Sequence, residues 1–138
     1  MTAKEYLSQI YYARLKLQRL QERRDEIRDR MQGISSPSLG QRVQTSSEDK
    51  MSKLMARLDD IDRKIAGQID REQRLIETIQ SQIDGIESPK HRELLSLRYV
   101  HCLKWEHIAD RMGYTERRVF QVYGEALAEF VRLYKDCI

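Results

Sequence analysis

Few residues in this chain interrupt a helix. Its 138 residues include only two prolines and six glycines, the residues that disfavour helix interiors most. Leu, Ile, Arg, Glu, Gln and Lys dominate instead, and this balance predicts an all-α protein. Hydrophobic residues make up only 40% of the chain and charged residues 34%, which is thin for a single globular core and favours elongated helices.

Cysteines and long apolar segments are also scarce. Cys102 and Cys137 are the only cysteines, and no run near the N-terminus resembles a signal peptide or a membrane span. The sequence therefore predicts a cytoplasmic protein with reduced thiols and no membrane partner. His91, His101 and His107 lie near Cys102 in the sequence, but their spacing matches no zinc pattern, so neither a metal nor another cofactor is expected.

The residue patterns of catalytic sites are missing as well. There is no glycine-rich phosphate loop, no pair of carboxylates expected to share a cleft, and no Ser, His and Asp set. An enzyme is therefore not expected. The net charge is only +3, so a nucleic-acid role would depend on where the charges lie and not on their sum.

Two long helices are predicted in the N-terminal part, residues 1–87. Residues 3–31 contain no helix breaker, and apolar side chains recur there at steps of three and four. Residues 32–47 are rich in Gly and Ser and predict a loop, for which a disordered tip is favoured over a binding loop. A second apolar face then runs along a helix through residues 48–86. These elements predict a long antiparallel helical hairpin that is coiled-coil-like.

The charges of the two helices favour their pairing. Residues 1–42 carry nine Lys and Arg against five Asp and Glu, whereas residues 48–87 carry seven against ten. Opposite charge favours a hairpin, although each exposed pair contributes only tenths of a kcal/mol, roughly. A hairpin closed by the predicted loop places Tyr6 opposite about Ile76, so the end of the second helix projects past the first.

Two apolar stripes remain without a partner in this hairpin. They consist of Leu7, Tyr11 and Leu15 on the first helix, and of Ile79, Ile83 and Ile86 on the overhanging end of the second. The second stripe must be buried by the C-terminal part of the chain, by a second chain, or by both. We expect two hairpins to pair through these residues, which would give an isologous homodimer.

A second domain, residues 88–138, is expected where Ser88 and Pro89 restart the helical pattern after the hairpin. Its first helix is apolar, the next begins at Trp105, and the last begins after Thr115 and continues to near the end of the chain. Trp105 is expected to close the core of these helices, and the alternative is that it supports a DNA-facing residue.

The run that follows Trp105 has the spacing of a helix-turn-helix. Ala109 is small where two helices must approach closely, and Gly113 follows four residues later, where the first helix has to end in a left-handed residue. Thr115 precedes the second helix as its N-cap. The apolar residues around this turn are spaced to close a small three-helix core, and they are Ile108, Met112, Tyr114, Val119 and Val122.

Four short runs connect this pattern to a known family. They are Leu94-Leu95-Ser96-Leu97-Arg98-Tyr99, Ile108-Ala109, Gly113-Tyr114-Thr115 and Ala126-Leu127. With these residues, the chain between about Arg92 and Phe130 resembles the region-four domain of bacterial sigma factors and the phage transcription regulators built on it, some of them late-gene activators. The resemblance implies a phage protein that binds DNA in the cytoplasm of a bacterial host cell, with RNA polymerase as a possible partner. The regions that a complete sigma factor uses for promoter melting are absent from this chain.

The last helix is expected to bind double-stranded DNA through the face that it turns away from the core. Arg117 and Gln121 can each form two hydrogen bonds with one base, guanine and adenine respectively, and Phe120 can contact a thymine methyl group. Gly124 would let the backbone come near the duplex. The remaining expected contacts flank this row or bind phosphates, and they come from Arg118, Thr115, Lys104 and Arg111.

The sequence thus predicts a sequence-specific DNA-binding transcription regulator that acts as a homodimer. One alternative stays open, in which the chain is a non-catalytic interaction protein that docks on RNA polymerase or another protein through the hairpin and the terminal domain. Residues 88–138 carry nine Lys and Arg against seven Asp and Glu, so their charge alone does not separate the two functions.

Overall fold

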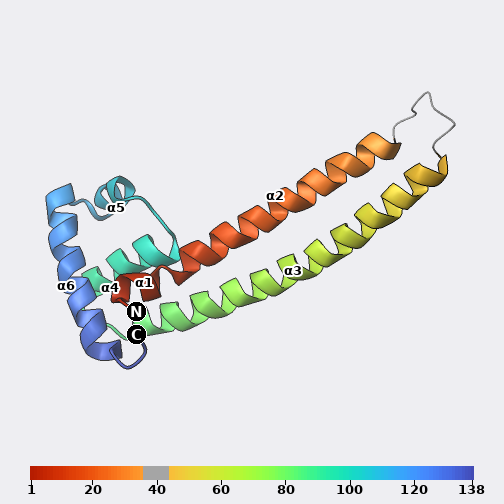
Figure 1. The fold of residues 1–138 in the computed structure, drawn as a ribbon. Coiled ribbons are helices and arrows are strands. Elements are labelled where there is room, and N and C mark those ends of the chain that lie inside the picture. The colour runs from red at the N-terminus through yellow and green to blue at the C-terminus, as the bar shows by residue number, and fades with distance from the viewer. Residues whose placement is uncertain (36–43) are drawn as a thin grey trace. The chain divides into compact units, whose positions relative to one another are not determined.

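The computed structural model describes residues 1–35 and 44–138, and most of these residues lie in helices (Figure 1). No strand occurs in these residues, which confirms the predicted all-α class. In chain order the elements are α1 (Ala3–Leu7), α2 (Gln9–Ser35), α3 (Gln44–Asp84), α4 (Pro89–Leu95), η2 (Ser96–Val100), α5 (Trp105–Met112) and α6 (Glu116–Tyr134), of which η2 is a π-helical turn.

The first helical stretch is interrupted at Ser8, so the prediction of one continuous helix over residues 3–31 was wrong. A capping box begins α1, in which Thr2 and Glu5 each accept a hydrogen bond from the backbone N–H of the other. Ser8 then closes α1 with a ψ of −5°, and α2 starts at the next residue. Serine is compatible with a helix interior, and therefore the sequence pattern contained no signal for this break.

The connection between the long helices is shorter than the predicted loop of residues 32–47. α2 continues to Ser35 and α3 begins at Gln44, so both edges of that loop are helical. Gly33 lies within the last turn of α2, where the cost of a helical glycine, about 1 kcal/mol, is tolerated. Residues 36–43, to which the expectation of a disordered tip or a binding loop applies, lie outside the described residues.

The chain divides into two compact units. The hairpin unit consists of residues 14–71, and the terminal unit consists of residues 1–13 together with residues 72–138. The expected boundary at Ser88 therefore falls inside the terminal unit. That unit takes in both the first residues of the chain and the last turns of α3, which the sequence had assigned to the hairpin.

In the hairpin unit, α2 and α3 pack against each other as the predicted antiparallel pair. The seam between them buries Leu20, Ile27, Leu54 and Ile65, and it also buries the polar side chain of Gln68. Arg24 lies beside this seam, with its guanidinium 4.0 Å from the carboxylate of Asp62.

The terminal unit has a continuous apolar core. Its buried side chains come from α1, α2, the end of α3 and every later element, and they are Leu7, Ile10, Ile79, Ile83, Ile86, Leu94, Leu95, Leu97, Tyr99, Val100, Ile108, Ala109, Val119, Val122, Ala126 and Phe130. Phe130 on α6 is fully buried, and its ring centroid lies 6.1 Å from that of Tyr6 and 4.9 Å from that of Tyr134. The C-terminal half of α6 therefore packs on the N-terminal helices and on the end of α3.

This core corrects the expected dimer contact. Leu7, Ile79, Ile83 and Ile86 are at most 1% exposed within a single chain, so they offer no surface to a second copy. The apolar overhang is covered by the C-terminal part of the same chain, which was one of the three possibilities that the sequence left open. Of the residues expected at a dimer interface, Tyr11 is exposed and Leu15 is half-buried.

The register expected for the first helix is also corrected. The hydroxyl group of Tyr6 donates a hydrogen bond of 2.8 Å to the side-chain carbonyl of Gln82, which lies six residues beyond the expected partner Ile76.

Candidate nucleic-acid interface

The turn between α5 and α6 has the predicted geometry. Gly113 adopts the left-handed conformation, with φ 69° and ψ 31°, and its N–H donates back to the last turn of α5. The N–H of Tyr114 donates to the carbonyl of Ala109 at 2.9 Å, which closes the helix end. Thr115 then caps α6, because its hydroxyl oxygen accepts a hydrogen bond of 3.2 Å from the N–H of Arg118.

Burial fixes the two faces of α6. Val119, Val122, Ala126 and Phe130 are fully buried, so this row faces the core of the terminal unit, as the spacing predicted for the first three. Three of the residues expected on the outward face are exposed, and these are Arg117, Gln121 and Gly124. A side chain added at Gly124 would meet no atom within 4 Å, which leaves the backbone of α6 open to a ligand at this point.

Arg118 and Gln121 are linked to each other and to the turn. Arg118 donates a hydrogen bond of 3.4 Å from Nη1 to the side-chain oxygen Oε1 of Gln121. Its guanidinium lies 5.9 Å from the centre of the Tyr114 ring. This contact orients the Gln121 amide along the outward face. Arg117, one residue earlier, forms no hydrogen bond or ion pair in the part of the chain that the structure describes.

Phe120 is half-exposed and stacks on Trp105, with 5.2 Å between the ring centroids. Trp105 also packs edge-on against Tyr123 at 4.6 Å and carries the guanidinium of Arg98 over its ring at 4.3 Å. Trp105 thus contacts the core and supports an outward residue at the same time. Sequence reasoning missed Arg98, because its place over Trp105 depends on how residues 101–104 fold.

The two cations expected at phosphates lie at opposite ends of α5. Lys104 is the residue before the helix, Arg111 is in its last turn, and both are exposed. α5 has eight residues, so the two positions are separated by about 10 Å along the axis. Lys104 is nearer to Trp105, and Arg111 is nearer to the turn and Thr115.

A buried pair of tyrosines joins η2 to α6 beneath this surface. The hydroxyl groups of Tyr99 and Tyr123 are 2.6 Å apart and share a hydrogen bond. Burial, together with this bond, raises the pKa of Tyr99 far above its ordinary range, so the hydroxyl stays protonated and remains a donor. Lys4 from α1 places its ammonium 5.7 Å from the centre of the Tyr123 ring, which adds a cation from the N-terminal segment.

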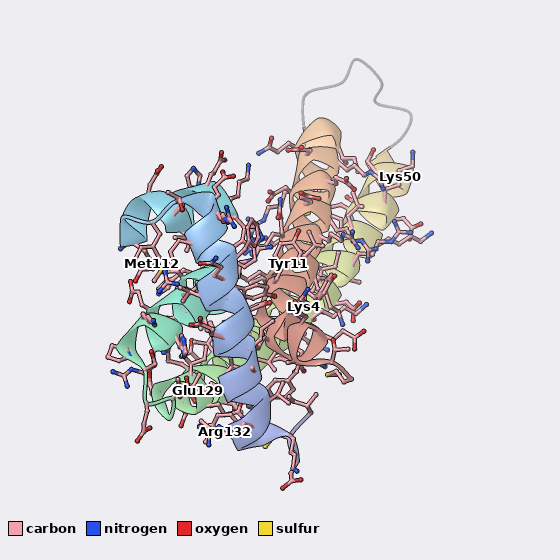
Figure 2. The ribbon with its side chains drawn as sticks, turned by 90° about the vertical axis from the view of Figure 1, so that its left-hand side faces the viewer. Lys4, Tyr11, Lys50, Met112, Glu129 and Arg132 are labelled. Atoms are coloured by element: carbon pink, nitrogen blue, oxygen red, sulfur yellow. The ribbon has the colours of Figure 1, made fainter. Side chains whose placement is uncertain are left out.

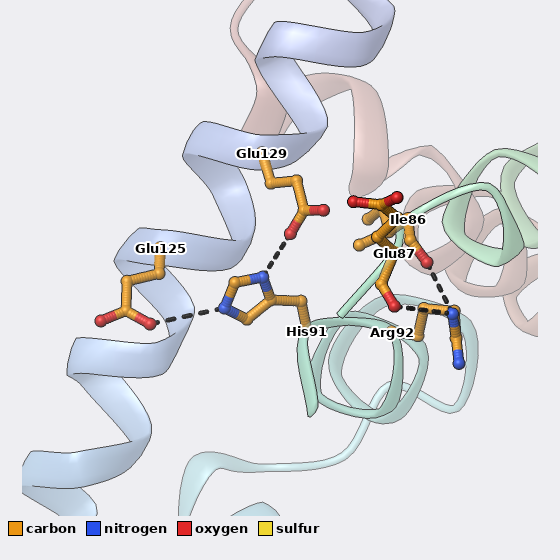
Figure 3. Close-up of polar contacts among 6 residues, drawn as sticks. All are labelled: Ile86, Glu87, His91, Arg92, Glu125 and Glu129. Atoms are coloured by element: carbon orange, nitrogen blue, oxygen red, sulfur yellow. Dashed lines mark hydrogen bonds and ion pairs between the residues drawn. The ribbon is translucent and has the colours of Figure 1, made fainter. Parts of the chain in front are cut away.

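The second half of α6 is joined to α4 by a polar cluster that the sequence did not indicate (Figure 3). His91 lies between Glu125 and Glu129, with Nε2 at 3.4 Å from the first carboxylate and Nδ1 in a short contact with the second. The hydrogen bond with His91 lowers the pKa of Glu129. Arg92 donates to the carbonyl oxygens of Ile86 and Glu87 at 2.7 and 3.1 Å, which holds the start of α4 against the end of α3.

Two further observations concern binding partners. Within the described residues, no group of three or more His, Cys, Asp and Glu side chains is placed to hold a metal ion. None of the helices described is both long and apolar enough to cross a membrane.

Comparison with known proteins places the chain in a family. Residues 33–130, more than half of the chain, match the family model described as a protein of unknown function, DUF1492. No curated protein and no solved structure matches. The matched range includes α3 and the whole turn between α5 and α6. The chain therefore belongs to the DUF1492 family.

Proposed function

We propose that this protein is a transcription regulator of the phage type that binds double-stranded DNA in a sequence-specific manner. The observation that supports the proposal best is the outward face of α6. Arg117, Gln121 and the open backbone at Gly124 form one exposed row directly after a left-handed glycine turn and a capped helix start. In helix-turn-helix proteins the corresponding part of the second helix enters the major groove.

The side chains of this row suit base recognition. A guanidinium matches O6 and N7 of guanine, and a carboxamide matches N6 and N7 of adenine, each through two hydrogen bonds. Phe120 is 50% exposed and is held from behind by Trp105, so its ring can contact a thymine methyl group without first leaving a core.

The same face can bind phosphates. The N-terminus of α6 presents backbone N–H groups beside Thr115, and Lys104 and Arg111 add exposed positive charge at the two ends of α5. Glu116 opposes this field because it is exposed in the first turn of α6, and we assign it no contact. These contacts would set the orientation of the protein, and the base contacts would set its specificity.

Fluorescence anisotropy tests the proposal on duplexes that span the region around the protein's own gene. The wild type should bind one duplex more tightly than the others, with an affinity that falls steeply as salt rises. The double variant Arg117→Ala, Gln121→Ala should lose about tenfold or more on the preferred duplex and little on the rest, since each good base contact contributes about 1–3 kcal/mol. Arg132→Ala is the matched control, because it removes an exposed arginine from the far end of α6.

Equal weak binding to every duplex, unchanged by the double variant, would contradict base readout. It would favour the second candidate function, which is docking on RNA polymerase or another protein. That candidate has an observation of its own in the terminal unit. An apolar groove of about 560 Å³ runs between α1 and α6 and is lined by Thr2, Ala3, Lys4, Leu127, Ala128 and Val131.

A further inference from the structure

A second groove of about 480 Å³ lies in the terminal unit on the N-terminal side of α5. Ser8, Tyr11 and Tyr12 line it from the N-terminal helical stretch, and Arg98, Tyr99, Cys102 and Lys104 line it from η2 and the segment that follows. Tyr11 and Tyr12 are 52% and 63% exposed, and Figure 2 labels Tyr11 on α2. Two aromatic residues this open have no role in the core.

The lining of this groove is positively charged. Among the described residues that line the groove, Arg98 and Lys104 are the charged ones, and none is a carboxylate. Neither cation forms an ion pair within residues 1–35 and 44–138. The hydroxyl groups of Ser8, Tyr11 and Tyr12 are further hydrogen-bond donors. Cations and hydroxyl donors without a competing carboxylate match an anion rich in oxygen, and a phosphate group is the commonest such ligand in the contacts of DNA-binding proteins.

Arg98 is held in place before any ligand arrives. Its Nη1 donates to the carbonyl of Leu103 at 2.9 Å, and its guanidinium lies over the ring of Trp105. A guanidinium has five N–H groups, so one bond to a carbonyl leaves others for a ligand. Because the side chain is already ordered, binding would cost less conformational entropy than it would for a free arginine.

The backbone beside Arg98 is folded in an unusual way. Cys102 has a φ of 55°, which is rare for a residue other than glycine, and the N–H of Leu103 donates back to the carbonyl of Leu97 at 3.0 Å. This conformation turns the chain back after η2 and places Lys104 on the same groove as Arg98. Left-handed backbone in such a residue costs about 1–2 kcal/mol, which is offset by the surrounding packing.

The groove adjoins the outward face of α6. Arg98 contacts Trp105, and Trp105 contacts Phe120. These two contacts connect the groove to the residues proposed to contact bases. Lys4, which lies over Tyr123, adds positive charge from the N-terminal segment.

We propose that this groove binds a phosphate group of the DNA backbone that flanks the base pairs contacted by α6. Arg98 and Lys104 neutralise the phosphate, and the hydroxyl groups of Tyr11 and Tyr12 donate hydrogen bonds to it. This inference rests on the proposed function, and it adds to the interface a part of the chain far from the helix-turn-helix in sequence. A free phosphate compound offers the same chemistry, so the experiment has to distinguish the two sources.

Anisotropy with duplexes of unrelated sequence, at several salt concentrations, separates this role from base readout. The double variant Arg98→Gln, Lys104→Gln should weaken binding to all duplexes by a similar factor, and it should reduce the slope of log affinity against log salt by about 1 for each phosphate that is no longer neutralised. Tyr11→Phe with Tyr12→Phe keeps both exposed rings and should weaken binding severalfold with the slope unchanged. Lys90→Gln removes an exposed cation of α4 that does not line the groove, and it is the control.

The two cysteines give a second readout in the unmodified protein. Cys102 lines the groove and Cys137 is exposed near the C-terminus, and neither forms a disulfide bond within the described residues. Bound duplex should slow alkylation of Cys102 by iodoacetamide and leave Cys137 unchanged. Inorganic phosphate at the same phosphate concentration should leave both rates unchanged if the ligand is the DNA backbone.

The outcomes that overturn the proposal are distinct from those that overturn the proposed function. If the wild type discriminates among duplexes but the groove variants keep its affinity and salt slope, the groove does not bind DNA and base readout by α6 stands. If inorganic phosphate alone protects Cys102 and the duplex does not, the ligand is a free phosphate compound. If no duplex binds, both proposals fail.

Discussion

The two units of this protein are stabilised in different ways. The terminal unit buries sixteen side chains in one continuous cluster, whereas the buried apolar residues of the hairpin seam, within the part of it that the structure describes, are Leu20, Ile27, Leu54 and Ile65. The hairpin unit adds exposed ion pairs one turn apart, such as Arg63 with Asp59, and each contributes roughly 0.3–0.5 kcal/mol. Apolar burial contributes far more per residue. Most of the buried apolar residues therefore lie in the unit that presents the turn and α6.

The two units also differ in how well the hydrogen-bonding groups of their polar side chains are paired. The hairpin seam buries Gln68, and beside it lies Arg24, whose Nε is buried without a hydrogen-bond partner. In the terminal unit, by contrast, the buried hydroxyl groups of Tyr99 and Tyr123 are paired with each other. A buried donor without a partner costs about 1–3 kcal/mol, so the hairpin seam is less well satisfied as well as thinner.

The largest effect is expected from Phe130→Ala. Phe130 is fully buried between Tyr6 and Tyr134, and its removal leaves a cavity in the densest part of the terminal unit. We expect the free energy of unfolding to fall by about 3–5 kcal/mol. Urea denaturation followed by circular dichroism measures it, and a loss below about 1 kcal/mol would show that this core does not dominate stability.

A smaller effect is expected from Ile65→Ala in the hairpin seam. Ile65 is 4% exposed, but a two-helix seam can close around a truncated side chain more easily than a core enclosed on all sides. The free energy of unfolding should fall by about 2 kcal/mol, at the low end for such substitutions. Amide hydrogen exchange should show faster opening in residues 14–71 and little change in α6. Equal acceleration in both units would mean that they unfold as one.

The smallest effect is expected from pH, through the contact between His91 and Glu129. The folded protein lowers the pKa of Glu129, so the contribution of this carboxylate to stability is fully present above the unfolded pKa of about 4.3 and is lost as the pH falls through the lower folded value. Because one polar contact changes and no buried apolar side chain is removed, this effect should be smaller than that of either cavity-forming substitution.

Urea midpoints of the wild type and of Glu129→Gln, measured from about pH 7 down to about pH 3, provide the test. The difference between the two proteins should be largest at neutral pH and should close in acid. Glu125→Gln is the control, because that carboxylate is 53% exposed and makes only the longer contact with His91. If the two urea midpoints still differ in acid, the loss of stability in Glu129→Gln comes from packing and not from the charge of the carboxylate.

Local signals in the sequence were sufficient to predict the turn and the faces of α6. Gly113 and Thr115 occupy positions where the backbone itself selects the residue type, and the spacing of Val119, Val122 and Ala126 determines a helix face. These features need no knowledge of distant parts of the chain. The all-α class and the antiparallel hairpin were predictable for the same reason.

Features that depend on distant contacts were not predictable in this way. The stripe around Leu7 was correctly identified as needing a partner, but periodicity shows which face is apolar and not what covers it. The left-handed Cys102 and the place of Arg98 over Trp105 depend on packing around η2, for which no residue pattern exists. The boundary of the terminal unit was missed because residues from both ends of the chain form it.

The shared core of the two chain ends also constrains how this protein is made. Tyr6 and Phe130 are in contact although they are far apart in the sequence, so Tyr6 is synthesised long before Phe130. The hairpin of residues 14–71 emerges before α6, and once formed it shortens the loop that must close when the last helix arrives. Until then Leu7, Ile10 and Ile83 have no cover from α6. A nascent chain that has not yet reached Phe130 therefore leaves an apolar stripe open to chaperones and proteases.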